Sequence, residues 1–323
     1  MKKQEVAGIL CLWVTALIWG TAFVAQKSGL DYLGPFTFNG VRSFIGGLAL
    51  LPCIVLIDLV NGQRPSLWGS CGSGERGLAL IKGGGYCGII LGIASSLQQY
   101  GIKYTSVGKA GFITTLYIII VPMLGVFFRR KVGIVMWFCS LLAIFGMYLL
   151  CFCGIGSQNV GGGETLHGIR VFGGLNVGDL LVFLCSIVFS FHILVVDRFA
   201  PQADGVRMSC IQFWVAGIIA TGCALIFENV VWRDLLNAKW PLLYAGVMSC
   251  GVAYTLQIIG QKSVQPVVAS LLMSLESVFA ALSGWLILHE RLSGTELLGC
   301  AIIFVAVIVA QLGDVKGKKN DRD

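Results

Sequence analysis

The chain has 323 residues, of which 56% are apolar and only 12% are charged. A soluble globular domain carries about 25% charged residues, so this composition excludes a soluble globule and predicts an integral membrane protein. The formal net charge of +7 is a topology signal and gives no indication of nucleic-acid binding.

Ten apolar stretches follow one another along the chain, and each is close to the ~20 residues that cross a hydrocarbon layer as a helix. We therefore expect an all-α integral membrane protein with ten transmembrane helices. The predicted spans are Val6–Val24, Pro35–Ile57, Gly83–Ile102, Val107–Phe128, Val132–Phe152, Val177–Val196, Cys210–Phe227, Pro241–Gln261, Val267–Leu288 and Thr295–Leu312.

The spans divide into two sets of five around a glycine-rich connector. An odd number of spans in each half places the second half upside down relative to the first, an arrangement typical of secondary transporters. The predicted organisation is a first repeat over residues 1–152, an external connector over 153–175, a second repeat over 176–313 and a basic cytoplasmic tail over 314–323.

The two halves also match in sequence. A shift of 159 positions aligns Leu97–Lys131 with Leu256–Glu290 without a gap and pairs Gln98 with Gln257. Apolar residues match by chance, but paired amides at membrane helix ends support an internal repeat.

The basic residues predict the orientation. If the N-terminus is cytoplasmic, fifteen of the 23 Lys and Arg residues lie on the cytoplasmic side and seven lie on the other. The positive-inside rule then places both termini in the cytoplasm, and we expect a multi-pass protein of the cell (inner) membrane.

Most of the twelve cysteines fall within apolar spans, where cysteine acts as a small buried hydrophobe. No disulfide scaffold, metal site or cofactor is expected. The sequence contains no G-x-x-x-x-G-K-[ST] motif and no zinc-protease helix, so neither an ATP motor nor an enzyme is predicted.

Several motifs resemble those of a known family. The pattern W-G-x-x-F at Trp19, Gly20 and Phe23, followed by Pro35 and Arg42 in P-x-x-x-x-x-x-R, resembles the first EamA-type repeat of the drug/metabolite transporter (DMT) superfamily. The stretch from Ser274 to Arg291 is similar to the ninth-helix signature of the second repeat. The resemblance implies two inverted five-helix repeats around a central cavity. Helices one to four and six to nine would line it, and helices five and ten would be peripheral.

Glu276 is the main candidate for function. It lies about ten residues into the ninth span, and at ~1.5 Å per residue this is ~15 Å deep, near the bilayer midplane. A carboxyl that exchanges a proton between two cavity states is what proton-coupled transport requires. Glu276 is therefore predicted to bind a proton or a cationic group of the substrate. The alternative is a permanently neutral side chain bonded to a neighbouring helix.

Arg42 lies ~10 Å from the outer end of the second span, close to the predicted level of Glu276. Three roles are open: a pair with Glu276 across the cavity, a clamp for a substrate carboxylate, or a stem that reaches the outer headgroups.

Other polar and aromatic residues are weaker candidates for the substrate site. His192 is expected near the cytoplasmic interface, where it would relay protons or simply be a satisfied interfacial side chain. The amides of Gln98 and Gln257 would contact solute or bridge helices. Trp19 would offer an aromatic wall. Tyr117, at the repeat position equivalent to Glu276, would offer a hydroxyl and an aromatic wall to the cavity or simply pack.

The predicted function is secondary active transport, specifically export of small metabolites such as amino acids or amphipathic drugs by alternating access, with proton coupling as a hypothesis. Pro122 would bend the fourth span and serve as a hinge or a static kink. A passive channel or facilitator and a membrane-embedded enzyme are the alternatives. The expected partners are a small-molecule substrate and the lipid bilayer, and a homodimer is open because the fifth and tenth helices could face lipid or another copy.

Overall fold

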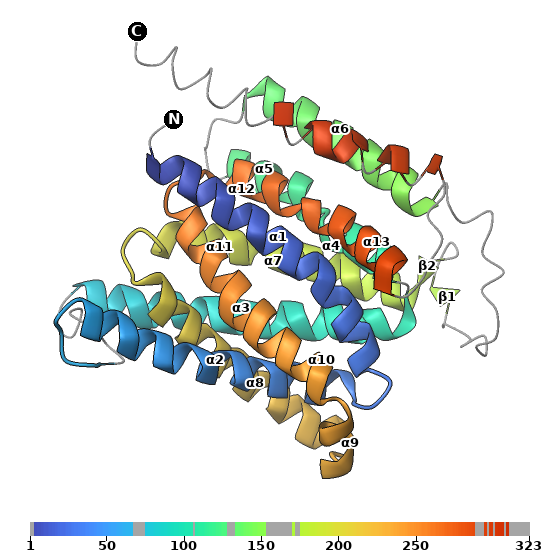
Figure 1. Cartoon of the computed structure of the whole chain (residues 1–323). Helices are drawn as coiled ribbons and strands as arrows, with labels where there is room; N and C mark the ends of the chain where they lie inside the picture. Colours follow the sequence, from blue (N-terminus) through green and yellow to red (C-terminus); the bar gives the residue numbers. More distant parts are fainter. Residues whose placement is uncertain are drawn as a thin grey trace, which may run out of the picture.

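The computed structural model describes residues 3–66, 75–105, 107–127, 133–152, 170–171, 175–287 and 294–309 without positions 296, 300 and 307. Almost all of these residues are helical (Figure 1). Two short strands, β1 (Arg170–Val171) and β2 (Leu175–Asn176), pair antiparallel, with Arg170 opposite Asn176.

The helices follow the apolar stretches of the sequence. In the first half they are α1 (Lys3–Gly29), α2 (Pro35–Val60), α3 (Glu75–Tyr104), α4 (Val107–Thr114), α5 (Tyr117–Phe127) and α6 (Ile134–Phe152). In the second half they are α7 (Val177–Phe199), α8 (Gly205–Phe227), α9 (Trp232–Asn237), α10 (Lys239–Leu243), the π-helical segment η4 (Tyr244–Ala253), α11 (Tyr254–Gln261), α12 (Pro266–Met273) and α13 (Leu275–Ile287).

Within the described residues, eight helical segments are long and apolar enough to cross a membrane, and Ile134–Gly146 and Leu297–Ala306 are shorter apolar helices. The first nine predicted spans are helical over their described residues except at Thr115, Leu116, Gly133 and Ser274, and the tenth is described only in pieces. The fourth, eighth and ninth spans are each divided into two or more segments. The fourth is interrupted at Thr115 and Leu116, and α5 continues through Pro122, where a bend was expected.

The breaks in the fourth and ninth spans are equivalent under the 159-residue shift. Thr115, just after α4, donates its hydroxyl to the Phe112 carbonyl at 2.9 Å, and Ser274, between α12 and α13, donates to the Leu271 carbonyl at 2.7 Å. The amide of Ile118 bonds back three residues to Thr115, and that of Ser277 bonds back three residues to Ser274. Hydroxyls that bond to the preceding turn often accompany helix bends, and both spans are interrupted at positions 159 residues apart.

Helices of the two halves cross each other in matched pairs. Helix α4 packs on α13 and α5 packs on α12, so the two broken spans run antiparallel. Glycines permit close crossings elsewhere. A Cβ at Gly101 of α3 would lie 2.9 Å from the Gly178 carbonyl of α7, and a Cβ at Gly260 of α11 would lie 2.9 Å from the Gly8 carbonyl of α1. Gly101 and Gly260, one in each of these crossings, are 159 positions apart, as in the sequence alignment of the two halves.

Polar contacts hold α2 to α8 at both ends. At the start of α2, the Glu228 carboxylate accepts hydrogen bonds from the amides of Phe36 at 2.9 Å and Thr37 at 2.7 Å. An acidic group at a helix N-terminus pairs with the unsatisfied amides and the helix dipole. At the other end, the buried Asp58 and Arg207 form an ion pair.

Segment η4 is a departure from α-helix that the apolar pattern does not predict. The amide of Tyr254 bonds five residues back to Ser249, as in a π-helix. The Thr15 hydroxyl of α1 lies within hydrogen-bond distance of the Cys11 carbonyl in its own helix, at 2.9 Å, and of the Ala253 carbonyl, at 3.0 Å. The neighbouring helix therefore offers a donor to a backbone acceptor at the end of the π-helical segment.

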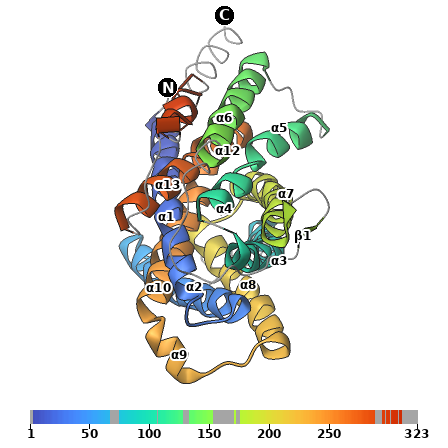
Figure 2. The same cartoon turned by 90° about the vertical axis from the view of Figure 1, so that its right-hand side faces the viewer.

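Helix α6 lies at the edge of the bundle, beside residues 297–306 (Figure 2). A Cβ at Gly146 would lie 2.8 Å from the Gly299 carbonyl, so the two segments are in close contact. The outward side of α6 presents exposed apolar side chains at Ile134, Phe138, Leu141 and Phe145. This spacing forms one apolar helix face, as expected for a surface in contact with lipid.

Candidate functional site

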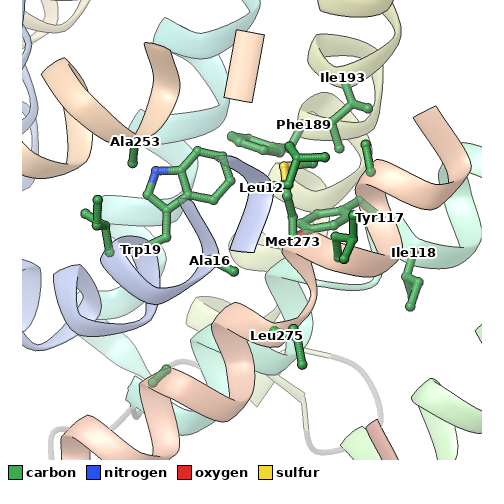
Figure 3. Packing of buried hydrophobic residues seen from close by; sticks show 14 of the residues in the cluster. Leu12, Ala16, Trp19, Tyr117, Ile118, Phe189, Ile193, Ala253, Met273 and Leu275 are labelled. Atoms are coloured by element: carbon green, nitrogen blue, oxygen red, sulfur yellow. The ribbon is translucent and has the colours of Figure 1, made fainter. Parts of the chain in front are cut away.

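Aromatic rings gather at the centre of the bundle. The Trp19 ring lies 4.6 Å from that of Tyr254 and 5.7 Å from that of Phe189. The Tyr254 ring in turn lies 5.2 Å from Phe213 and 6.1 Å from His192. Figure 3 shows Trp19 and Phe189 within the same buried cluster as Tyr117. The rings come from α1, α7, α8 and α11, and the cluster therefore joins the two halves of the chain.

A narrow cavity opens beside these rings. Its lining comes from α1, α2, α3, α4, α7, η4, α11 and α13, and combines aromatic, amide, hydroxyl and charged side chains. The lining residues are Trp19, Phe23, Gln26, Arg42, Gln98, Thr114, Phe189, Ser249, Tyr254 and Glu276. These segments correspond to predicted spans one to four, six, eight and nine, whereas α8, the seventh span, contributes no residue to the described lining.

Glu276 reaches the cavity from the first turn of α13, directly after the break at Ser274. It is 3% exposed, and its Oε1 atom has no hydrogen-bond partner among the described residues. Tyr117 occupies the equivalent place after the break at Thr115 and is fully buried. Its hydroxyl interacts with the Glu276 carboxyl. The two equivalent helix breaks thus present one acid and one phenol at the centre of the bundle.

Arg42 reaches the same cavity from α2. Its Nε donates to Asn39 Oδ1 at 3.1 Å, and Asn39 in turn donates to Ser95 at 2.9 Å. In the part of the chain that the structure describes, no ion pair joins Arg42 to Glu276. The two side chains share a cavity without the direct pairing that was one expectation, and a substrate could contact both. Because Arg42 is 4% exposed and held by Asn39, its guanidinium does not extend to the bundle surface.

Only some of the remaining predicted residues line the cavity. Gln98 lines it and donates to the Thr114 hydroxyl at 3.2 Å. Gln257 is fully buried but outside the described lining.

His192 differs from the expectation of an interfacial position: it is fully buried and bonds to Gln212 at 3.2 Å. The reason is that α7 continues to Phe199, so His192 lies well inside the helix. Pro122 is buried within α5.

Sequence reasoning missed several residues. Phe189, Ser249 and Tyr254 line the cavity but stand in apolar spans where no pattern marks the inward face. The Asp58–Arg207 pair was also missed, although a charge beside an apolar span is a usable signal. The predicted second span ended at Ile57, one residue before Asp58, whereas α2 continues to Val60.

The fold and the site together define a helical membrane protein with a polar, aromatic-lined cavity between its two halves. The EamA-like transporter family matches residues 6–152 and 176–311, and the chain belongs to this family. This agrees with the resemblance found in the sequence motifs.

Individual relatives extend this finding over nearly the whole chain. An uncharacterized transporter of Archaeoglobus fulgidus is 28% identical over 94% of this chain and 85% of its own length. A protein of Escherichia coli named a probable amino-acid metabolite efflux pump is 24% identical over 97% of this chain and 96% of its own. One crystal structure shares the fold, with a TM-score of 0.69 and 20% identity over 95% of this chain and 97% of the other.

Proposed function

We propose that this protein is a secondary active transporter that exports small metabolites, such as amino acids or amphipathic drugs, by alternating access. The observation that carries the proposal is the buried Glu276 carboxyl in a polar cavity where two broken helices cross. Intramembrane acids are costly to place and mark ion or substrate pathways. The name of the related E. coli protein supports amino acids as one substrate class.

The proposed architecture is ten helices in two inverted five-helix repeats, covering residues 1–152 and 176–313. Three observations support it: the equivalent breaks at Thr115 and Ser274, the crossing glycines Gly101 and Gly260 at equivalent repeat positions, and the antiparallel packing of α4–α5 on α12–α13. Inverted repeats that rock against each other open a central site to one face and then to the other. Pro122 and the two breaks are the positions where such a movement would bend a helix.

The chemistry of the site suits a substrate with separated polar groups. Glu276 would bind a proton or a cationic group, and the rings of Trp19 and Tyr254 would add cation–π attraction. Arg42 would hold a carboxylate through its free guanidinium nitrogens. Exchange of the proton on Glu276 for a substrate cation would couple export to proton entry.

The cell membrane, with both termini in the cytoplasm, is the proposed location. The excess of basic residues on the N-terminal side supports this orientation. At the opposite end, the exposed Trp232 and Trp240 on α9 and α10 are suited to a membrane–water interface. The outer face of α6 is open to lipid or to a second copy in a homodimer.

A passive channel is the second candidate. Channels usually present rings of like residues contributed by several subunits. The described lining of this cavity instead has one acidic residue, Glu276, and one basic residue, Arg42. The internal correspondence of the two halves therefore favours a carrier. A membrane-embedded enzyme has weaker support, because the cavity brings together no nucleophile–base pair among the described residues.

Counterflow in proteoliposomes tests the proposal. Vesicles holding the purified chain and an unlabelled amino-acid mixture are placed in buffer with a trace of radiolabelled amino acids. A carrier accumulates label transiently above equilibrium, whereas a channel only equilibrates it. We expect accumulation that Glu276→Gln abolishes and that Asp31→Asn, a change at an exposed acid, leaves intact. Equilibration without accumulation would contradict the proposal.

A further inference from the structure

A second group of buried polar side chains lies beside the cavity, between α7, α8 and α11. We call it the inner amide cluster, and it comprises His192, Gln212, Gln257 and Gln261, each between 0% and 2% exposed. None of the four belongs to the described lining of the cavity.

Hydrogen bonds and helix spacing relate these side chains to one another. His192 and Gln212 are bonded at 3.2 Å across α7 and α8. The Gln261 side chain contacts α7 at the residue after His192, where its Nε2 donates to the Ile193 carbonyl at 3.3 Å. On α11, Tyr254, Gln257 and Gln261 follow at spacings of three and four, so they share one helix face. The cluster therefore extends from Tyr254, which lines the cavity, toward the ends of α7 and α11.

The cluster holds more hydrogen-bonding capacity than it uses. Within the described chain, five of its atoms have no partner: His192 Nδ1, Gln212 Nε2, Gln257 Nε2 and Oε1, and Gln261 Oε1. Buried polar atoms are nearly always bonded to protein or to water. A neutral amide left unpaired in an apolar interior is destabilising. For Gln257 this would apply to both the nitrogen and the oxygen of its side-chain amide.

The chemistry of the cluster also differs from that of the cavity. Glu276 and Arg42 give the cavity opposite charges, whereas the amides of the cluster offer unpaired donors and acceptors without a formal charge. Groups that both donate and accept hydrogen bonds, such as water, hydroxyls and amides, match such a surface.

We propose that the inner amide cluster is a hydrated site that forms the solute path between the cavity and the ends of α7 and α11. Its resident ligand is water, and the uncharged polar part of a solute replaces that water during transport. The assignment of a path rests on the proposed function. The hydration of the site can be tested by itself.

Thiol labelling compares neighbouring positions at the same depth. Gln257→Cys places a thiol in the cluster, and Ile258→Cys places one in the adjacent apolar cluster with Leu80 and Val196. Both native side chains are 0% exposed. N-ethylmaleimide reacts with the thiolate, which forms readily only in water. In native membranes we expect position 257 to react about tenfold faster than position 258, as measured by mass spectrometry of the labelled peptides.

A second pair repeats the comparison on α8. Gln212→Cys is matched by Met208→Cys one turn earlier, where the native methionine is also fully buried. The native Cys87, buried in the apolar cluster, reports folding in every sample because it is labelled only if the variant unfolds. If one variant unfolds, the pair on the other helix gives the result.

Faster labelling at positions 257 and 212 than at their controls supports the hydrated site. Equal rates within both pairs of folded variants would overturn it. The same samples can be reconstituted for counterflow. If positions 257 and 212 are labelled preferentially but the wild type shows no counterflow, the hydrated site stands and the proposed function is rejected. If the wild type shows normal counterflow but the labelling rates are equal, the proposed function stands and the hydrated site is rejected.

Discussion

Replacing Glu276 by glutamine removes the acid from the described cavity lining. The variant keeps the size of the side chain and its position after the break at Ser274, but it cannot release a proton. We expect it to lose proton movement driven by a substrate gradient, because no other acid belongs to the described cavity lining. A pH-sensitive dye inside proteoliposomes measures this movement when an amino-acid mixture is added outside, with Asp31→Asn as the control. Dye signals that are the same for wild type and Glu276→Gln would reject the coupling role.

Part of the site was predictable at the residue scale. Glu276, Arg42, Gln98 and Trp19 were expected in the cavity and line it. A charge or amide within an apolar span is noticeable because it is costly to place there. Phe189 and Tyr254 carry no such signal, since aromatic residues are common on every face of a membrane helix. The burial of His192 depends on where α7 ends, and helix ends are poorly defined by apolar runs.

At the element scale, the contact between α1 and α13 positions the acid. A Cβ at Gly20 would lie 2.8 Å from both the Ala280 amide nitrogen and the Glu276 carbonyl oxygen. Gly20→Ala must therefore push α1 away from the helix that carries Glu276, at a cost of roughly 1–3 kcal/mol. Gly85 of α3 has no atom within 4 Å of an added Cβ, so Gly85→Ala should instead stabilise by about 1 kcal/mol.

Thermal unfolding of the two alanine variants in the same detergent measures this contrast. We expect the transition of Gly20→Ala to fall below the wild type and that of Gly85→Ala to equal or exceed it. If Gly20→Ala were as stable as Gly85→Ala, the close packing of α1 on α13 would be wrong.

The sequence predicted helix positions better than helix shape. Apolar length places the spans, because any uninterrupted apolar run of this length must satisfy its backbone as a helix. It does not reveal where a helix changes geometry. The breaks at Thr115 and Ser274 lie within apolar runs, and η4 is π-helical although the segment of α3 that lies 159 positions earlier is α-helical. The 159-residue alignment already paired Thr115 with Ser274, and that pair of hydroxyls was the available signal.

At the scale of the whole molecule, polar contacts at both ends of α2 hold the two halves together. Asp58 accepts a hydrogen bond from the Ser66 amide at 3.0 Å and pairs with Arg207 of α8. Asp58→Asn leaves the Arg207 charge buried with weakened compensation, so we expect a lower unfolding temperature. Removing both charges in an Asp58→Leu, Arg207→Leu double variant should recover part of the loss, because an apolar pair carries no desolvation cost.

Unfolding curves of the wild type and the two variants at one pH and salt concentration check this expectation. A double variant less stable than Asp58→Asn would contradict this expectation. It would mean that removing both charges costs more stability than leaving Arg207 without Asp58, with only its contacts to Asp204 and Ser66.

The central claim is that one cavity opens in turn to each face of the membrane, and accessibility at Thr114 tests it most directly. Thr114→Cys places a thiol in the cavity lining with little change in size. A membrane-impermeant maleimide is applied separately to right-side-out and inside-out vesicles, and the label at position 114 is quantified by mass spectrometry. Alternating access predicts labelling from both faces, faster than at the buried Cys87. Labelling from one face alone, or from neither, would contradict the account.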